Sequence, residues 1–259
     1  MLIDTHAHLY FEQFEEDREQ VIQRALQAGV EKIINIAVDL ETAEQSIRLA
    51  EAHSGLFAAV GIHPNDASQL ANGTLAALRE YSRHPKVVAI GEIGLDFYRD
   101  RTPRAAQERA FRQQISLARQ VGLPIVIHNR QAIGAILDIL RTEGTEGLRG
   151  VFHCFSESAQ FAEQVLEMGF HISFTGNLTF KKSELPAVAQ VVPLERLLLE
   201  TDSPFLSPEP KRGRRNEPAR VLHIARKLAE IKGTDVAEIE RITTENAVQL
   251  FGLGAKDME

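Results

Sequence analysis

The chain alternates short apolar runs with longer segments of helical periodicity. The apolar runs lack the polar alternation of a half-exposed strand, so each predicts a strand buried on both faces of a parallel sheet. Eight such runs occur, at residues 2–5, 32–38, 56–60, 87–90, 123–127, 150–152, 170–175 and 197–199. The intervening and closing segments predict helices at residues 14–28, 40–52, 74–81, 104–121, 132–141, 159–168, 182–191, 217–232 and 235–251.

The strict alternation of strand and helix indicates a parallel sheet with crossover helices. Eight such units in 259 residues close most simply into a TIM-type (β/α)8 barrel of the α/β class, with residues 1–259 forming a single domain. An open doubly wound sheet is the competing architecture. It is disfavoured because no glycine-rich phosphate loop follows the first strand.

Composition narrows the possible environments and partners. The net charge of -7 argues against a protein coated with nucleic acid over a broad surface, although it allows a local phosphate site. A single cysteine, Cys154, cannot form an internal disulfide, which favours a reducing cytoplasm. No apolar run is long enough to span a membrane, and a strand that begins at Leu2 leaves no room for a cleavable signal. We therefore expect a cytoplasmic protein with no membrane partner.

Histidines and carboxylates follow the predicted strands at their C-terminal ends. They are His6, His8, His63, Glu92, His128, His153 and Asp202. In a β/α barrel these strand ends face one common site. His6 and His8 are two residues apart on one strand, so their side chains share a face. Imidazoles and carboxylates gathered in this way predict a metal centre.

The number of candidate ligands favours two ions over one. Without His63 there are six, which is more than one ion with an open catalytic position normally takes from protein. Two divalent ions that share a bridging carboxylate fit this count better. The expected assignment is Glu92 as the bridge, His6, His8 and Asp202 on one ion, and His128 and His153 on the other. Mixed donors of this kind suit Zn, Mn, Fe or Ni, whereas Mg favours oxygen.

The motifs around these residues resemble one known family over essentially the whole chain. They read IDTHAH from Ile3, GIHP from Gly61, GEIGLDFY from Gly91, PIVIHNR from Pro124, FHCF from Phe152, LETDSP from Leu199, RGRRNEP from Arg212 and TENA from Thr244. Together they are similar to those of the TatD-type metal-dependent deoxyribonucleases. Two departures concern substrate loops: Glu157 stands where many members have glycine, and Asn129 and Gln131 stand where many have serine and aspartate.

The resemblance implies both a fold and an activity. It implies a β/α barrel with a two-metal site on the histidines, Glu92 and Asp202, and hydrolysis of nucleic-acid phosphodiesters by activated water. DNA is the expected substrate, RNA is a further possibility, and single-stranded ends are the expected point of attack. Glu92 and Asp202 are the expected catalytic residues, although Asp202 in a Thr-Asp-Ser-Pro sequence could instead cap a helix. No obligate protein partner is evident.

Substrate contacts are expected around the mouth of the barrel. His63 exceeds the ligand count and is assigned to substrate. Arg130, two residues beyond His128, could bind a phosphate oxygen, and Tyr98 and Phe155 could stack on a base.

A basic loop provides further candidates. Lys211, Arg212, Arg214 and Arg215 follow the last strand, and Arg212 and Arg215 are predicted to contact phosphates. A solvated run of charges is the competing interpretation.

Two other functions compete with the nuclease hypothesis. The first is hydrolysis of C–N or ester bonds, as in the wider amidohydrolase-like barrels or in an aminoacyl-tRNA deacylase. Those amidohydrolases often bridge two metals with a modified lysine, so a glutamate on the fourth strand disfavours that variant. The second is a non-catalytic, metal-dependent binding module, which a complete ligand set with open coordination disfavours.

Overall fold

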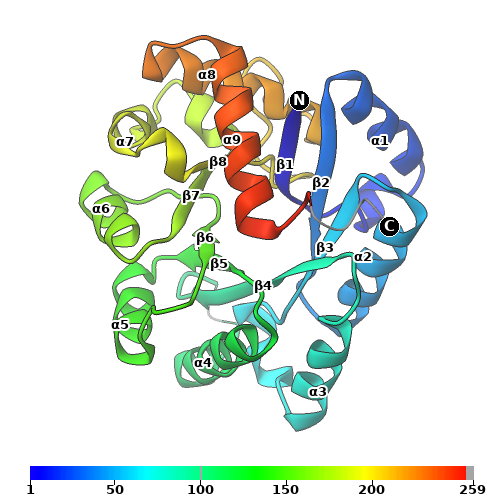
Figure 1. The fold of residues 1–259 in the computed structure, drawn as a ribbon, viewed down its shortest axis with the longest axis vertical. Helices are drawn as coiled ribbons and strands as arrows, with labels where there is room; N and C mark the ends of the chain where they lie inside the picture. Colours follow the sequence, from blue (N-terminus) through cyan, green and yellow to red (C-terminus); the bar gives the residue numbers. More distant parts are fainter. Residues whose placement is uncertain (100, 255–259) are drawn as a thin grey trace.

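Eight parallel strands form a ring surrounded by helices in the computed structural model, which describes residues 1–99 and 101–254 (Figure 1). The strands are β1 (Leu2–Ala7), β2 (Val30–Ile36), β3 (Leu56–Val60), β4 (Val87–Asp96), β5 (Ile125–Arg130), β6 (Gly150–Phe152), β7 (His171–Phe174) and β8 (Leu197–Leu199). Each pairs in parallel with the next along the chain. The predicted (β/α)8 barrel is confirmed.

Helices α1 to α8 follow the eight strands in turn and cover the outside of the ring, and α9 comes directly after α8 (Figure 1). They are α1 (Arg18–Gln27), α2 (Leu40–Ala52), α3 (Asn72–Tyr81), α4 (Arg104–Val121), α5 (Ile133–Glu143), α6 (Ala159–Glu167), α7 (Leu185–Val191), α8 (Val221–Lys232) and α9 (Val236–Phe251). Short 3₁₀ turns lie at Glu12–Phe14, Pro64–Gln69, Gly176–Thr179, Leu194–Arg196 and Pro218–Arg220. The predicted helices at 14–28 and 217–232 therefore begin later than expected, because a 3₁₀ turn precedes each.

The ring closes through the segment that follows β8. The amide N–H of Asp202 donates to the His6 carbonyl over 2.8 Å, and that of His8 donates to the Ser203 carbonyl over 2.8 Å. These two bonds attach the residues after β8 to the end of β1. The first and last strands therefore deliver their polar side chains to the same place.

A buried side-chain contact strengthens this closure. The carboxylate of Asp4, which is fully buried, accepts hydrogen bonds from the Thr201 amide at 2.9 Å and from its hydroxyl at 2.6 Å. Asp4 lies two residues before His6, and Thr201 lies next to Asp202, so each partner is close to a candidate metal ligand. The contact therefore fixes the two strand ends relative to one another.

Helix α9 closes the ring at the end opposite these polar residues. Its Ala247, Leu250 and Phe251 pack in one core cluster with inward-facing strand residues such as Ile3 and Val126. Figure 1 shows α9 (red) lying across the ring. Apolar side chains therefore fill the interior of the ring at the α9 end. The polar residues gather at the opposite end, where the strands finish.

The fourth and fifth strands run further than the apolar pattern predicts. Strand β4 continues to Asp96. Glu92 therefore lies inside the strand, whereas the sequence analysis placed it after the end of the strand. Strand β5 likewise includes His128 and Arg130. The two strands stay paired as far as Asp96 and Arg130, with a register shift between Ile90 and Ile93. Backbone pairing therefore continues where the side chains become polar.

Candidate metal centre and substrate pocket

Two glycines explain how Glu92 is placed among the other strand ends. A Cβ atom on Gly91 would lie 2.6 Å from Cβ of Val126, and one on Gly94 would lie 2.1 Å from the His128 carbonyl oxygen. Gly94 also has φ +140°, where side chains are rarely tolerated. Only glycine at both positions lets β5 approach β4 this closely, and the approach brings His128 against Glu92.

The two carboxylate oxygens of Glu92 face different groups of histidines. Its Oε2 lies 3.5 Å from Nε2 of His6 and 3.9 Å from Nε2 of His8. Its Oε1 lies 2.6 Å from Nδ1 of His128 and 2.9 Å from Nε2 of His153. The side chain is almost fully buried. The structure thus places Glu92 between the two ligand groups that the sequence analysis separated.

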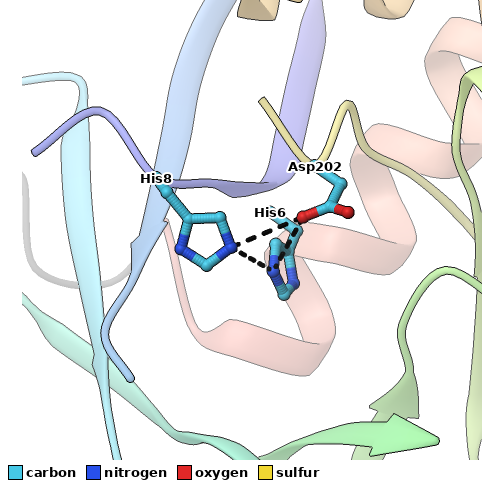
Figure 2. Close-up of side chains that lie close together, drawn as sticks. All are labelled: His6, His8 and Asp202. Carbon is cyan, nitrogen blue, oxygen red and sulfur yellow. Dashed lines mark hydrogen bonds and ion pairs between the residues drawn. The ribbon is translucent and has the colours of Figure 1, made fainter. Parts of the chain in front are cut away.

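The first group consists of His6, His8 and Asp202, whose side chains point toward one another (Figure 2). The Nε2 atoms of His6 and His8 are 3.2 Å apart. Oδ1 of Asp202 lies 3.6 Å from Nε2 of His6 and 3.4 Å from Nε2 of His8. The predicted juxtaposition of His6 and His8 is therefore present. Asp202 is followed by a loop and begins no helix, so the structure gives no support to a capping role.

The hydrogen bonds of His8 determine which of its nitrogens can bind a cation. Its Nδ1 lies 2.8 Å from the Ile36 carbonyl, which can only accept, so Nδ1 carries the proton. In the neutral ring Nε2 then has a free lone pair directed at His6 and Asp202. Histidine ligands of metals typically donate their second ring N–H to a carbonyl or carboxylate in this way.

The second group lies on the other side of Glu92. Nε2 of His153 is 3.3 Å from Nδ1 of His128, and both face Oε1 of Glu92. His63 also approaches this oxygen, with its Nε2 at 3.6 Å. Its Nδ1 accepts a hydrogen bond from the Asn65 amide at 3.1 Å. A neutral His63 therefore carries its proton on Nε2, which makes that atom a hydrogen-bond donor and no ligand. This agrees with the predicted substrate contact, which stays a prediction.

Two buried carboxylates lie next to the ring nitrogens of the second group that point away from Glu92, and the sequence analysis gave them no role. Oδ2 of Asp96 lies 3.5 Å from Nε2 of His128, and Oε1 of Glu200 lies 3.5 Å from Nδ1 of His153. Glu200 is itself held by the Cys154 amide at 2.6 Å. The only sequence signal was position: one carboxylate lies four residues after Glu92 on the same strand, and the other follows β8 directly.

Burial and charge act in opposite directions on these groups. Burial lowers the pKa of His153, but the carboxylates of Glu92 and Glu200 raise it by more, so it lies well above its usual range. Burial raises the pKa of Glu92, but the histidines around it, His153 foremost, lower it by more. Burial, with His128 nearby, lowers the pKa of His63 to about 3. The buried carboxylates of Glu92 and Glu200 thus face one imidazole, His153, that is either protonated or bound to a cation at neutral pH.

A pocket of about 720 Å³ opens above this cluster. It is lined by all the candidate ligands except the deeply buried His6, together with His63, Arg99, Arg101, Arg130 and Phe205. Arg130 has its guanidinium carbon 4.3 Å from the ring centre of Tyr98, as a cation–π pair at the rim. The two departures from the family pattern also meet here, because Asn129 donates to Glu157 over 2.8 Å.

Arg212 and Arg215 of the basic loop contact other side chains of the protein. Arg215 forms two hydrogen bonds to the carboxylate of Asp17, at 2.8 and 2.7 Å, and stacks on Phe14. Arg212 stacks on Phe180 with its guanidinium carbon 3.6 Å from the ring centre. Neither lines the pocket. The structure therefore gives no support to their predicted phosphate contacts.

Arg99 and Arg101 occupy the pocket wall in their place. Both follow β4 and line the pocket, and sequence reasoning missed them because Asp100 between them leaves no run of like charges. The prediction for Phe155 is corrected as well, whereas that for Tyr98 stays a prediction. Phe155 is 2 % exposed and packs in the core, so it cannot stack on a base. Phe11 and Phe205 line the pocket instead.

Comparison with known proteins agrees with the class of protein that this barrel and cluster define, a metal-dependent hydrolase. The profile of the TatD related DNase family matches residues 3–252. The chain therefore belongs to the TatD family.

Relatives from several bacteria are similar over nearly their full lengths. The Bacillus subtilis protein named "Uncharacterized metal-dependent hydrolase YabD" is 46 % identical over 252 residues, which cover 97 % of this chain and 99 % of that protein. The "3'-5' ssDNA/RNA exonuclease TatD" of Cronobacter sakazakii is 37 % identical, covering 96 % and 97 %. The crystal structure of YJJV, a TatD homologue from Escherichia coli K12, superposes with a TM-score of 0.91 at 34 % identity, covering 97 % and 98 %.

No helix within residues 1–99 and 101–254 combines the length and the apolar character that crossing a bilayer requires.

Proposed function

We propose that this chain is a two-metal phosphodiesterase that removes nucleotides from the ends of single-stranded DNA or RNA. The observation that carries the proposal is the position of Glu92, whose two oxygens face two separate groups of donors. The names of the relatives from Cronobacter sakazakii and Musicola paradisiaca, "3'-5' ssDNA/RNA exonuclease TatD", support the choice of substrate.

The chemistry of the donors supports two divalent ions. His6, His8 and Asp202 present ligand atoms within 4.8 Å of one another, and His8 is held in a tautomer suited to a metal. We assign His128 and His153 to the second ion and Glu92 to both. Nitrogen and oxygen donors in this mixture favour Zn, Mn, Fe or Ni. Such ions, when bound, polarise a phosphodiester and activate water.

The remaining chemistry falls to the chain itself. Burial raises the pKa of Asp202, but His8 and His6 lower it by more, so the carboxylate is ionised at neutral pH and can accept a proton. His63 offers its Nε2 proton to an oxygen of the substrate. Arg99, Arg101 and Arg130 bind phosphates along one wall of the pocket.

Metal content and turnover of Glu92→Gln test the bridge. The change removes a charge shared by both ions, so bound metal and nuclease activity should fall together. Glu195→Gln, at an exposed glutamate outside the pocket, is the matched control. Two metals still bound per chain with normal turnover would exclude Glu92 as the bridge.

A substrate panel tests the reaction class. Single-stranded DNA, duplex DNA, RNA and simple amide and ester substrates are assayed with several divalent ions. The proposal expects shortening of single strands from an end and no amide hydrolysis. Preferential cleavage of amides or carboxylic esters would favour the amidohydrolase or deacylase alternative. The described residues that line the pocket include no lysine that could serve as a modified bridge between two metals. This disfavours the form of the amidohydrolase alternative that uses such a lysine.

A further inference from the structure

An exposed aromatic ring stands at the edge of the pocket. Five large hydrophobic residues are exposed in the described part of the chain: Met1, Leu26, Tyr98, Val191 and Phe205. Of these, Phe205 alone lines the pocket, with 47 % of its surface accessible. Tyr98 has one ring face covered by Arg130. Phe205 therefore presents apolar surface inside a cavity whose other lining residues are mostly of polar type.

Phe205 belongs to an aromatic layer next to the first ligand group. Its ring centre lies 5.9 Å from that of Phe11 at an interplanar angle of 71°, an edge-to-face contact. Phe11 in turn stacks on His8, with ring centres 5.0 Å apart and an angle of 14°. Both phenylalanines line the pocket. The layer thus connects the pocket wall directly to a candidate metal ligand.

The backbone holds Phe205 in a defined position. Its N–H donates to the Asp202 carbonyl over 2.8 Å. Its carbonyl accepts from Nδ2 of Asn216 at 2.7 Å, and the same amide donates to the Thr201 carbonyl at 2.9 Å. Asn216 is fully buried. The turn that positions the carboxylate of Asp202 therefore also positions the ring three residues later.

We infer that Phe205, supported by Phe11, is the stacking platform for one unpaired nucleobase of the substrate. A half-exposed planar ring next to the ligand group is a surface on which a base can stack, and such stacking tolerates any base sequence. The pocket residues Arg99, Arg101 and Arg130 lie after β4 and in β5, across the ring from β1 and β8, so base and phosphates meet separate walls. The inference rests on the proposed function for its ligand, a single-stranded nucleic acid, but concerns a site that the metal ligands do not form.

A fluorescent variant measures the stacking directly. The chain contains no tryptophan, so Phe205→Trp introduces a single reporter at the platform. Leu26→Trp, at an equally exposed position on α1 outside the pocket, is the matched control. A short single-stranded oligonucleotide should strongly quench the fluorescence of the Phe205→Trp variant, whereas an otherwise identical oligonucleotide with abasic sites should quench it weakly. Neither should affect the Leu26→Trp variant. Equal quenching by both oligonucleotides, or none, would overturn the inference.

A cleavage assay separates this inference from the proposed function. Base stacking on an aromatic side chain corresponds to roughly a 5- to 150-fold change in affinity. The unmodified protein should therefore favour the intact over the abasic oligonucleotide in kcat/KM by about that factor, and Phe205→Ala should bring the ratio toward one. Cleavage of both oligonucleotides at equal rates would overturn the platform and leave the nuclease intact. Selective quenching without cleavage would overturn the nuclease and leave the platform.

Discussion

The salt dependence of DNA binding distinguishes the arginines of the pocket from those of the basic loop. We expect that replacing Arg99, Arg101 and Arg130 together by alanine weakens binding of single-stranded DNA and flattens its salt dependence. Arg215→Ala should leave both unchanged, because its guanidinium is bound to Asp17.

The expected magnitude follows from the number of phosphate contacts. Each contact contributes roughly 0.7 to the slope of log affinity against log salt for a single strand, so losing three lowers the slope by about 2. Over a fourfold rise in salt, the affinity of the unmodified protein should therefore fall roughly 20-fold more than that of the triple variant. Arg215→Ala should instead cost about 0.2–1 kcal/mol of stability, because the ion pair that it forms with Asp17 is partly exposed.

Fluorescence anisotropy of a labelled oligonucleotide over a salt series gives both slopes, and thermal unfolding gives the stability. Metal content is measured on each variant, since a fall in bound metal would affect DNA binding by another route. The reasoning is refuted if the triple variant keeps the original slope. It is equally refuted if Arg215→Ala lowers the slope while the protein stays folded, because the basic loop would then hold the DNA.

Two further predictions concern the metal centre. Glu200→Gln should lower metal affinity or activity roughly 10- to 100-fold, because the carboxylate that faces Nδ1 of His153 is lost. Equilibrium dialysis and turnover measure this, with Glu195→Gln as the control. Unchanged values would show that Glu200 does not support His153 as a ligand. Metal binding should weaken as pH falls. Nearby carboxylates raise the pKa values of His153, His128 and His8 despite burial. Protons therefore begin to compete with metal for these nitrogens at a pH above the usual pKa of histidine. Calorimetry in buffers of different ionisation enthalpy should record proton release on metal binding at neutral pH. If no protons are released, the prediction is wrong.

The sequence by itself determined the barrel and the identity of its candidate ligands. Strand–helix alternation is a local pattern, and a parallel sheet of eight crossover units has few ways to close. Because strand ends in a barrel converge, residues as distant as His6 and Asp202 could be assigned to one site without knowledge of any contact. The pairing of His6 with His8 needed only the two-residue repeat of a strand.

Tertiary structure decided how those ligands are held and where substrate can reach them. The ion pair of Arg215 with Asp17 joins residues 198 positions apart, and nothing local distinguishes it from a free basic loop. The tautomer of His8 depends on a carbonyl of a neighbouring strand, Ile36. Whether an aromatic residue is core, as Phe155 is, or pocket wall, as Phe205 is, depends on which elements pack over it. Local periodicity reports which face of an element is apolar, but contacts between distant segments decide what each polar or aromatic side chain meets.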